Sequence, residues 1–303
     1  MPSFEYDRKI AVLSDGEAIT FAHKSTFDDV QSHRLHINNY VEIYIYISGD
    51  TDYIIEDAYH TLRPGDVMVI TPHQVHAAVI KTPCQYERFY LLFPTHFFSQ
   101  FRFDPLHALL RRSSTQSARV HLNERERKTA HKLLRQMSAL CADDHSDSSS
   151  FEIFSLLTQF LCLLHNTDAA SSAQPDGDVR LPELLHEILA HINANLTQIE
   201  SVRQIADTFH VSLPYLSSLF SKHIGIPLSI YLRTRKIAYA KQLLESGQSV
   251  TYAAYEAGFS DCSYFIKCFR ECLGMTPHQY KTQQQSGTGS APVYLTKSAQ
   301  MQK

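Results

Sequence analysis

The C-terminal fold is decided by residues 253–280, AAYEAGFSDCSYFIKCFRECLGMTPHQY, which repeat the pattern of residues 205–231, IADTFHVSLPYLSSLFSKHIGIPLSIY. The offset between matching residues is 48 before the central turn, as for Ala206 and Ala254, and 49 after it. The second copy therefore has one extra residue, which we place within residues 261–264. A repeat of this kind predicts two copies of one structural unit.

Each copy is typical of a helix-turn-helix unit. A small residue lets two helices cross closely, an apolar residue fills the hinge, and Gly258 can adopt the left-handed turn in the second copy. Ser212 in the first copy and Ser260 or Asp261 in the second can cap the helix that follows. That helix carries apolar pairs four residues apart, which would hold it on the core: Leu216 with Phe220 and Phe265 with Phe269.

The two capped helices would present polar outer faces. These faces consist of Pro214, Ser217, Ser218 and Ser221 in the first unit and Ser263, Tyr264, Lys267 and Arg270 in the second. Residues 228–245 read as one connecting helix, and two helices in successive major grooves must lie roughly 34 Å apart. An ordinary helical bundle would also contain apolar pairs, but two matched units favour DNA binding. Ile266 could be buried or could contact a thymine methyl group, and we favour burial.

Charge is distributed unevenly along the chain. The net charge of −3 gives no sign of a nucleic-acid partner, but residues 203–281 hold nine Lys and Arg against five Asp and Glu. Phosphate contacts need cations gathered on one surface. The candidates for these contacts are Arg233, Arg235, Lys236, Lys267 and Arg270. We interpret Lys241 and Lys281 as ordinary solvated positions.

The second unit closely resembles the signature of the AraC/XylS family of transcription regulators, in the run Gly258-Phe259-Ser260-Asp261-Cys262-Ser263-Tyr264-Phe265 followed by Gly274-Met275-Thr276-Pro277 and Tyr280-Lys281. The resemblance covers residues 181–281. It implies a monomeric reader that binds adjacent major grooves, often as an activator that contacts RNA polymerase. By position, it implies base contacts from Pro214, Ser217, Ser218, Ser263 and Lys267.

This sequence departs from better-known members of that family in the first unit. The first recognition helix carries no Arg or Gln, and serine hydroxyls discriminate between bases less than a bidentate arginine. We therefore expect weaker specificity from that half.

The N-terminal half reads as short strands. Residues 41–47 alternate between aliphatic side chains and Glu42, Tyr44 and Tyr46, a pattern typical of a strand between two unlike environments. A hairpin around residues 56–58 and a turn at residues 63–66 favour a small barrel or sandwich. Further along, the sequence predicts helices over residues 124–140 and 151–164, with a loop at 143–150 and a flexible linker at 169–178.

The strand region resembles the degenerate cupin-type sensor domain of the same family, in His36, Glu42, Gly49, Pro64-Gly65-Asp66 and Pro72-x-x-x-His76. The resemblance implies a double-stranded β-helix that binds a small effector, often a sugar, followed by helices that dimerise. Carboxylate and imidazole groups beside aromatic faces suit a sugar. The candidate effector residues are His36, Glu42, Tyr44, Tyr46, His76 and Arg88, each of which is equally compatible with a satisfied polar position in the core.

A metal ion is the alternative ligand for these histidines and this carboxylate. Cupin enzymes offer a paired His-x-His, whereas this sequence has Arg34 two residues before His36, where a metal ligand is expected. We therefore predict no bound metal, no cofactor and no catalytic residues. No nucleotide-binding glycine loop, nucleophile elbow or His-Glu-x-x-His motif is present.

Composition excludes several classes of protein. The chain has 303 residues, 44% of them hydrophobic and 19% charged, and no apolar run approaches the roughly 18 residues of a membrane span. The first twenty residues carry six charges, and the six cysteines form no Cys-x-x-Cys pair. We therefore expect a cytoplasmic protein with reduced thiols and no membrane association.

Together these observations predict a multidomain α+β protein. The expected parts are a cupin-like effector-binding domain (1–120), a helical dimerisation and linker region (121–180), an AraC-type DNA-binding domain (181–282) and a disordered tail (283–303). The predicted function is a ligand-responsive, sequence-specific transcription regulator, an activator that fits carbohydrate-use genes and acts as a homodimer. The alternatives are a metal-dependent cupin enzyme fused to a DNA-binding domain, or a regulator whose barrel is closed to small molecules and which binds other proteins.

Overall fold

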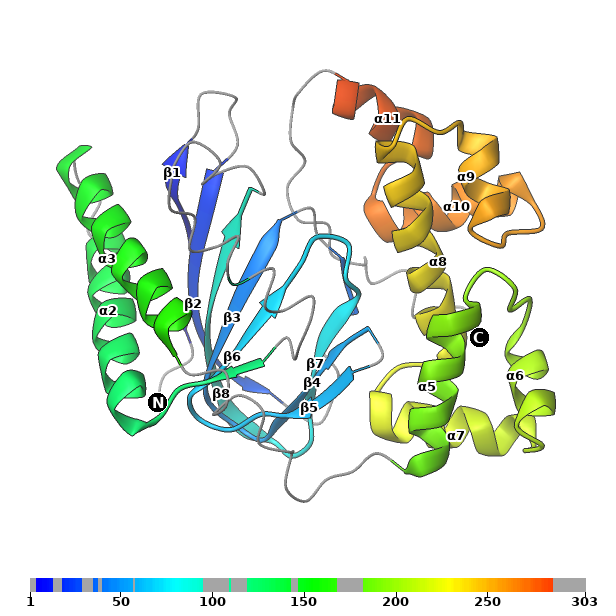
Figure 1. Ribbon diagram of the computed structural model, residues 1–303, viewed down its shortest axis with the longest axis horizontal. Helices are drawn as coiled ribbons and strands as arrows, with labels where there is room; N and C mark the ends of the chain where they lie inside the picture. Colours follow the sequence, from blue (N-terminus) through cyan, green and yellow to red (C-terminus); the bar gives the residue numbers. More distant parts are fainter. Residues whose placement is uncertain are drawn as a thin grey trace.

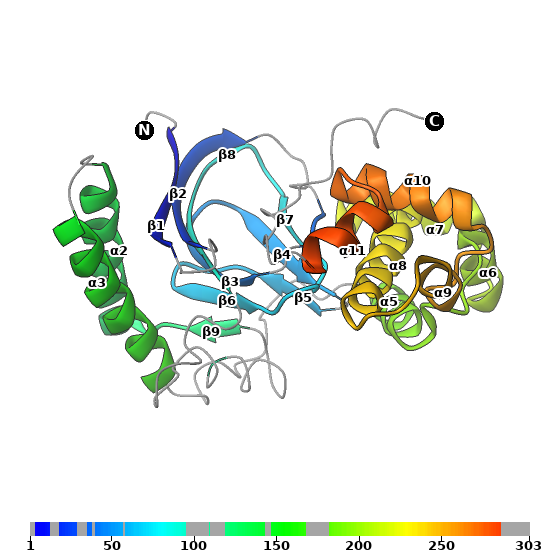
Figure 2. The same ribbon diagram turned by 90° about the horizontal axis from the view of Figure 1, so that it is seen from above.

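The computed structural model describes residues 4–12, 18–28, 35–37, 40–56, 58–94, 109, 119–142, 147–167 and 182–285. A β domain occupies the N-terminal half and a helical domain the C-terminal half, with a pair of long helices on the far side of the β domain (Figures 1 and 2). The predicted linker at residues 169–178 and Arg34 lie outside the described residues, as does most of the predicted tail.

The described strands of the β domain form two antiparallel sheets. The larger sheet has the order β1-β2-β8-β3-β6-β9, and the smaller has the order β5-β4-β7. The strands are β1 (Phe4–Val12), β2 (Ala18–Asp28), β3 (Val41–Ser48), β4 (Thr51–Ile55), β5 (Ala58–Thr61), β6 (Asp66–Ile70), β7 (His76–Ile80), β8 (Cys84–Phe93) and β9 (Arg119–His121). The predicted hairpin is confirmed, since β4 pairs with β5 in register from Asp52 with Thr61 to Ile55 with Ala58.

Strand β3 has the two unlike faces that its alternation predicts. Val41, Ile43 and Ile45 belong to an apolar cluster with the helices α2 (Glu124–Ala142) and α3 (Asp147–Asn166). Tyr44 and Tyr46 belong to a separate cluster between the two sheets. The helix pair therefore covers one face of the larger sheet (Figure 2). The other face carries the tyrosines together with Met68 and Ile70.

Two predicted boundaries in this chain need correction. The loop predicted at residues 143–150 is shorter, because α3 already begins at Asp147. At the C-terminal end, the predicted tail loses its first three residues to α11 (Pro277–Gln285). No helix in the described part of the chain is long and apolar enough to cross a membrane.

The helical domain consists of α5 (Glu183–Asn195), α6 (Val202–Thr208), α7 (Leu213–Ile224), α8 (Leu228–Glu245), α9 (Val250–Glu256), α10 (Cys262–Leu273) and α11. The single connecting helix predicted at residues 228–245 is confirmed as α8. Its apolar residues, together with those of the surrounding helices, form one buried cluster.

The internal repeat holds at the level of individual hydrogen bonds. Val211 N–H donates to Ala206 C=O, and Phe259 N–H donates to Ala254 C=O, and each bond is 3.0 Å long. The donors of the two bonds are 48 residues apart in the sequence, as are the acceptors. The caps that follow, Ser212 and Asp261, are 49 residues apart. The extra residue of the second copy is therefore Ser260, which lies just before the range of 261–264 that the sequence suggested.

The β domain and the helical domain share apolar packing. The apolar cluster of the helical domain also contains residues from the smaller sheet and the segment beside it, namely Leu35, Ile37, Ile54, Val75, Ala77 and Val79. Residues 35–37 join β7 through two hydrogen bonds of 3.1 Å between the backbones of His36 and His76. The outer face of the smaller sheet is thus the surface on which the helical domain is seated (Figure 1).

Candidate nucleic-acid interface and effector site

Both predicted recognition helices begin at the expected capping residues. The Ser212 side chain accepts a hydrogen bond from Tyr215 N–H at the start of α7, and the Asp261 carboxylate accepts one from Tyr264 N–H at the start of α10. Each helix ends in a left-handed glycine, Gly225 or Gly274, and this is the conformation that glycine tolerates best. Local sequence therefore sets the length of both helices.

The predicted outer faces of these two helices are exposed. All eight residues proposed for them are solvent-exposed: Pro214, Ser217, Ser218 and Ser221 on α7, and Ser263, Tyr264, Lys267 and Arg270 on α10. The Lys267 side chain retains 61% of its exposure. The apolar pairs on the opposite faces are fully buried, as expected: Leu216 with Phe220, and Phe265 with Phe269.

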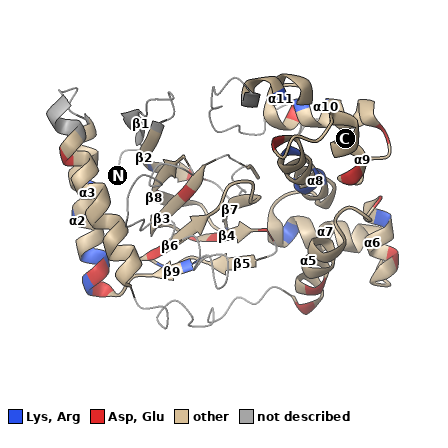
Figure 3. Ribbon diagram, turned by 45° about the horizontal axis from the view of Figure 1, so that its top comes forward, with Lys and Arg blue, Asp and Glu red and all other residues tan. Residues whose placement is uncertain are grey.

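The cations predicted on α8 are placed differently. Arg235 and Lys236 are buried, at 6% and 7% exposure, so in this structure neither can reach a phosphate on a bound duplex. Arg233 is half-buried, with its guanidinium 3.5 Å from the Glu271 carboxylate. Figure 3 shows that α8 is nonetheless one of the basic segments of the helical domain. The number of Lys and Arg residues in this part of the sequence is therefore larger than the number that can contact phosphate.

Lys236 holds the two units together. Its ammonium donates hydrogen bonds of 2.7 Å to the carbonyl oxygens of Ile199, before the first unit, and Gly258, in the hinge of the second. Burial lowers the pKa of Lys236, and nearby Glu200 only partly offsets this effect. The side chain thus acts as an internal clamp that fixes the spacing between the units.

Three further expectations have different outcomes. Lys241 is only 2% exposed, and burial lowers its pKa to about 8 despite the opposing effect of Glu245, so its reading as a solvated position was wrong. Lys281 donates to the carbonyls of Gly247 and Gln248 after α8, which is a structural role.

Ile266 is 37% exposed on α10, which contradicts the expected burial.

The predicted effector residues gather between the two sheets. The Tyr44 ring lies 4.6 Å from the Tyr53 ring, which in turn lies 6.3 Å from His76. The Tyr44 hydroxyl is hydrogen-bonded to Tyr86, and Tyr46 packs near the same ring. The aromatic residues are all buried, so the strand alternation correctly placed Tyr44 and Tyr46 on one face.

Arg88 extends this group at its other end. Its guanidinium lies 4.1 Å above the Tyr86 ring and donates a 2.9 Å hydrogen bond to the Thr26 hydroxyl. Burial raises the pKa of Tyr86 to about 12, against the lowering effect of the Arg88 charge. Tyr53 and Tyr86 were missing from the predicted set. Tyr53 occupies a strand position alternating with Ile54, and this signal could have identified it.

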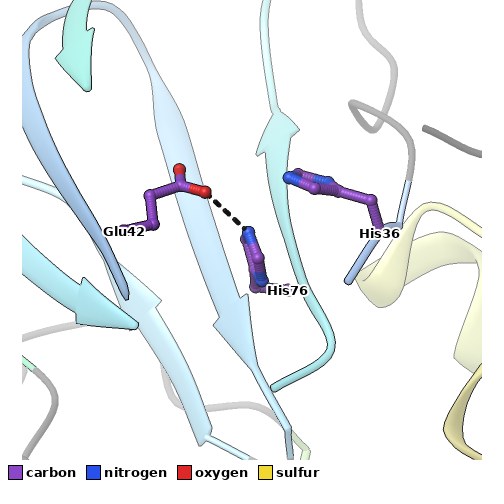
Figure 4. A group of neighbouring side chains, drawn as sticks. All are labelled: His36, Glu42 and His76. Atoms are coloured by element: carbon purple, nitrogen blue, oxygen red, sulfur yellow. Dashed lines mark hydrogen bonds and ion pairs between the residues drawn. The ribbon is translucent and has the colours of Figure 1, made fainter. Parts of the chain in front are cut away.

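His36, Glu42 and His76 form the polar part of the site (Figure 4). His76 Nε2 lies 3.1 Å from a Glu42 carboxylate oxygen, and His76 Nδ1 lies 2.8 Å from Gln74 C=O. The His36 ring centre is 4.1 Å from that of His76. Burial acts to lower the pKa of His76, but the Glu42 carboxylate and the Gln74 carbonyl raise it overall.

These three residues could also hold a metal ion. One donor atom from each lies within 4.8 Å of the others, and two imidazoles with a carboxylate suit a divalent transition metal. The Gln74 carbonyl contacts His76 Nδ1, the kind of outer contact that orients a ligating histidine. The same contacts equally stabilise a buried Glu-His pair without a metal.

Two residues at the boundary between the domains were missed altogether. Glu56, in the β4–β5 turn, forms an ion pair with Arg235 on α8. His73, before β7, has its Nε2 2.9 Å from a Glu245 carboxylate oxygen at the end of α8. Their partners could not be predicted, because nothing local in a sequence signals a contact between residues more than 170 positions apart.

Comparison with known proteins agrees with the geometry of the helical domain. A helix-turn-helix domain family matches residues 205–283. The regulator YfiF of Bacillus subtilis is 35% identical over 33% of this chain and 32% of its own length. The transcriptional activator RhaS of Escherichia fergusonii is 30% identical over 35% of this chain and 38% of its own.

A shorter relative shows how little of the chain these matches involve. The multiple antibiotic resistance protein MarA of Escherichia coli is 29% identical over 34% of this chain, which covers 82% of MarA. By contrast, this chain spans only about a third of the length of YfiF and RhaS. The likeness therefore rests on the C-terminal helices. These helices form a helix-turn-helix domain of the kind found in the AraC/XylS family of transcription regulators.

Proposed function

We propose that this protein is a sequence-specific, DNA-binding transcription regulator whose activity depends on a small molecule. The observation that carries the proposal is the pair of matched helix-turn-helix units, each with a capped second helix whose polar face is exposed. An ordinary helical bundle has no reason to repeat the same caps, turns and buried pairs at a fixed offset. Two exposed helices of this type suit adjacent major grooves.

The chemistry of the two faces supports an unequal division of roles. In α10, Lys267 and Arg270 offer cations for guanine edges or phosphates, and the Ser263 hydroxyl can bond either a donor or an acceptor. In α7, Pro214 and the serines supply hydroxyl and apolar contacts without charge. The second unit therefore contributes more of the electrostatic affinity, and the first contributes fit to the groove.

The proposed effector site is the polar and aromatic group between the two sheets. Acidic and imidazole acceptors beside tyrosine rings suit a hydroxylated molecule such as a sugar, and this supports the proposal that the regulated genes serve carbohydrate use. His36, Glu42, Tyr44, Tyr46, His76 and Arg88 would supply the contacts. We propose that this region, residues 1–120, has a cupin-like double-stranded β-helix fold.

The remaining expectations form part of the same proposal. Helices α2 and α3, in residues 121–180, would provide a homodimer interface, and the 80% exposure of Phe151 on α3 supports this placement. The relative RhaS is named as a transcriptional activator, in keeping with activation through contact with RNA polymerase. All six cysteines are free thiols, consistent with a cytoplasmic location. The DNA-binding domain would occupy residues 181–282.

The proposal does not include catalysis. The relatives are named as regulators, and the His36, Glu42 and His76 group is the feature that favoured an enzyme. Elemental analysis of the purified protein tests that alternative. Stoichiometric iron, manganese or zinc, lost in His36→Ala, would favour the metal-dependent enzyme.

Selection from random duplexes tests DNA binding. The purified full chain should enrich one consensus sequence, and Lys267→Ala should bind that sequence more weakly. Lys132→Ala is a matched control, because Lys132 is exposed on α2, away from the recognition helices. Failure to enrich any sequence, or equal affinity for selected and random duplexes, would overturn the proposal.

A further inference from the structure

Glu56 touches both the candidate effector region and the DNA-binding domain. It lies in the turn between β4 and β5 with a φ of +56°, in the left-handed region where residues other than glycine are uncommon. Backbone conformations of this kind persist where surrounding contacts fix them, and they are frequent at functional positions. The backbone and the carboxylate of Glu56 both contact neighbouring residues in this conformation.

On the side of the β domain, Glu56 is tied to the residue next to His76. Its backbone N–H donates to Val75 C=O at 2.8 Å, and its carboxylate accepts a hydrogen bond of 2.7 Å from Val75 N–H. The neighbouring pair, Ile55 and His76, are partners in the β4–β7 ladder. A shift of His76 therefore moves the strand that holds the Glu56 carboxylate.

On the side of the helical domain, Glu56 contacts α8 twice. The second oxygen of its carboxylate forms an ion pair with Arg235, and its backbone carbonyl accepts a hydrogen bond from the Tyr231 hydroxyl. Arg235 is further held by Asn193 Oδ1 at 2.8 Å and by the Tyr231 hydroxyl at 3.1 Å. These contacts account for the burial of a cation that the sequence assigned to DNA.

From Tyr231 the contacts continue into the first recognition helix. The Tyr231 ring lies 5.3 Å from the ring of Phe220, one of the residues that seat α7 on the core. Glu42, His76, Val75, Glu56, Tyr231 and Phe220 therefore make a continuous series of contacts from the effector site to α7. Coupling between sites requires such a contiguous set of groups, together with an element that has two arrangements.

The surroundings of the ion pair leave room for a second arrangement. A cavity of about 430 Å³ lies between the domains, and Glu56, His73, Asn193 and Arg235 are among its lining residues. Close-packed cores resist movement, whereas groups that line a cavity can move without unpacking apolar contacts. His73, in the segment between β6 and β7, forms an ion pair with Glu245, but its Nδ1 has no hydrogen-bond partner among the described residues.

We propose that Glu56 is the coupling residue between the two domains: its carboxylate links the His76 strand to Arg235 on α8, and a change at the effector site alters the recognition helices by altering this pair. The inference rests on the proposed function, since it names the route by which that regulation acts. Glu56 is a positioning residue, because it touches neither DNA nor the effector group directly. An effector acts through this pair only if it binds the two arrangements with different affinity.

The experiment uses duplex DNA as the probe, because coupling between two binding sites is reciprocal. A selected duplex is added to the full chain, and hydrogen exchange of the peptide covering residues 71–80 is followed by mass spectrometry. In the wild type, the duplex should change the exchange rate of this peptide by about five-fold or more. Glu56→Gln should reduce the response to less than about two-fold while the duplex still binds.

Two further variants make the result decisive. Glu124→Gln is the matched control, because Glu124 is exposed on α2 with a local partner in Lys128, and it should respond like the wild type. Arg235→Gln should abolish the response as Glu56→Gln does, and the double variant should show no additional loss. Direct shielding of the peptide by DNA would persist in all variants, so a response that survives Glu56→Gln overturns the coupling role.

The outcomes separate the two proposals. If no duplex binds, the proposed function fails. If the duplex binds but the wild-type peptide shows no change in exchange, the function stands and the coupling through Glu56 is wrong. If Glu56→Gln does not fold, Arg235→Gln, which changes the other domain, provides the same test.

Discussion

The two helix-turn-helix units have the same backbone but different chemistry. In the hinge of the first unit, His210 adopts a φ of +53°, and at the equivalent position in the second unit Gly258 adopts a φ of +80°. The hinge of the second unit is also tightly packed, because a Cβ on Gly258 would clash with the backbone carbonyl oxygen of Thr197. A strained histidine therefore adopts the left-handed conformation in the first unit, and in the second unit the same position requires a glycine.

The outer faces differ in a second respect. The second unit presents Lys267 and Arg270, whereas the predicted contact positions of the first carry proline and serine. Evolution of a repeat can evidently preserve the caps and the core while the exposed residues diverge. Packing therefore constrains the second unit more, and charge makes it the stronger candidate for contacts with phosphate.

The largest expected effect is at Gly258. Gly258→Ala should lower the free energy of unfolding by about 4 kcal/mol, because it combines left-handed strain with a backbone clash. Gly247→Ala is the matched control, since Gly247 has a φ of +92° but no atom lies within 4 Å of the position that an added Cβ would take. It should cost only about 1 kcal/mol. If urea unfolding gave the same loss of free energy for Gly258→Ala and Gly247→Ala, the hinge of the second unit would not be closely packed.

The next effect concerns Lys241 on α8, which lies 5.7 Å from the Tyr280 ring beside the second unit. Burial lowers its pKa from 10.5 to about 8, so the unfolded chain binds more protons between these values and stability rises with pH. Relative to Lys241→Met, the wild type should gain about 2 kcal/mol between about pH 7 and about pH 9.5. Parallel stability curves for the two proteins would contradict the lowered pKa.

A smaller effect is expected in DNA affinity. Lys267→Ala should weaken binding to the selected duplex by about ten-fold and reduce the slope of log affinity against log salt by about one. Ser217→Ala, at an uncharged position of the first unit, should change affinity less and leave the salt slope unchanged. Fluorescence anisotropy over a salt series measures both quantities. If Ser217→Ala reduced the slope of log affinity against log salt and Lys267→Ala did not, the first unit and not the second would supply the phosphate contacts.

The smallest effect compares the caps. Asp261→Ala and Ser212→Ala should each lower the free energy of unfolding by about 1 kcal/mol, because each leaves one helix N–H without its side-chain acceptor. Chemical denaturation of both variants measures these losses. An unchanged free energy of unfolding in either variant would show that the side-chain cap of that unit does not stabilise its helix.

The sequence predicted the local features of this molecule well. The alternation through Tyr44 and Tyr46 is confirmed because a strand places successive residues on opposite faces. The caps Ser212 and Asp261 are confirmed because they depend on hydrogen bonds three residues away. Periodicity and capping are short-range properties, so a single sequence contains them.

Contacts between distant segments could not be predicted in the same way. Arg235 and Lys236 were read as cations for phosphate, yet their partners, Glu56 and the carbonyls of Ile199 and Gly258, lie far away in the sequence. Charge counted along a chain does not distinguish a solvated cation from one clamped between carbonyls. For the same reason, the burial of Lys241 could not be predicted from the sequence.

Footprinting of the major groove on a selected duplex tests the central claim most directly. Protection of guanine N7 from methylation should appear in two clusters about one helical turn, or about 10 base pairs, apart. Lys267→Ala should weaken one cluster and leave the other. A single protected cluster, or two clusters that weaken together, would contradict the account of two units that bind adjacent grooves with unequal chemistry.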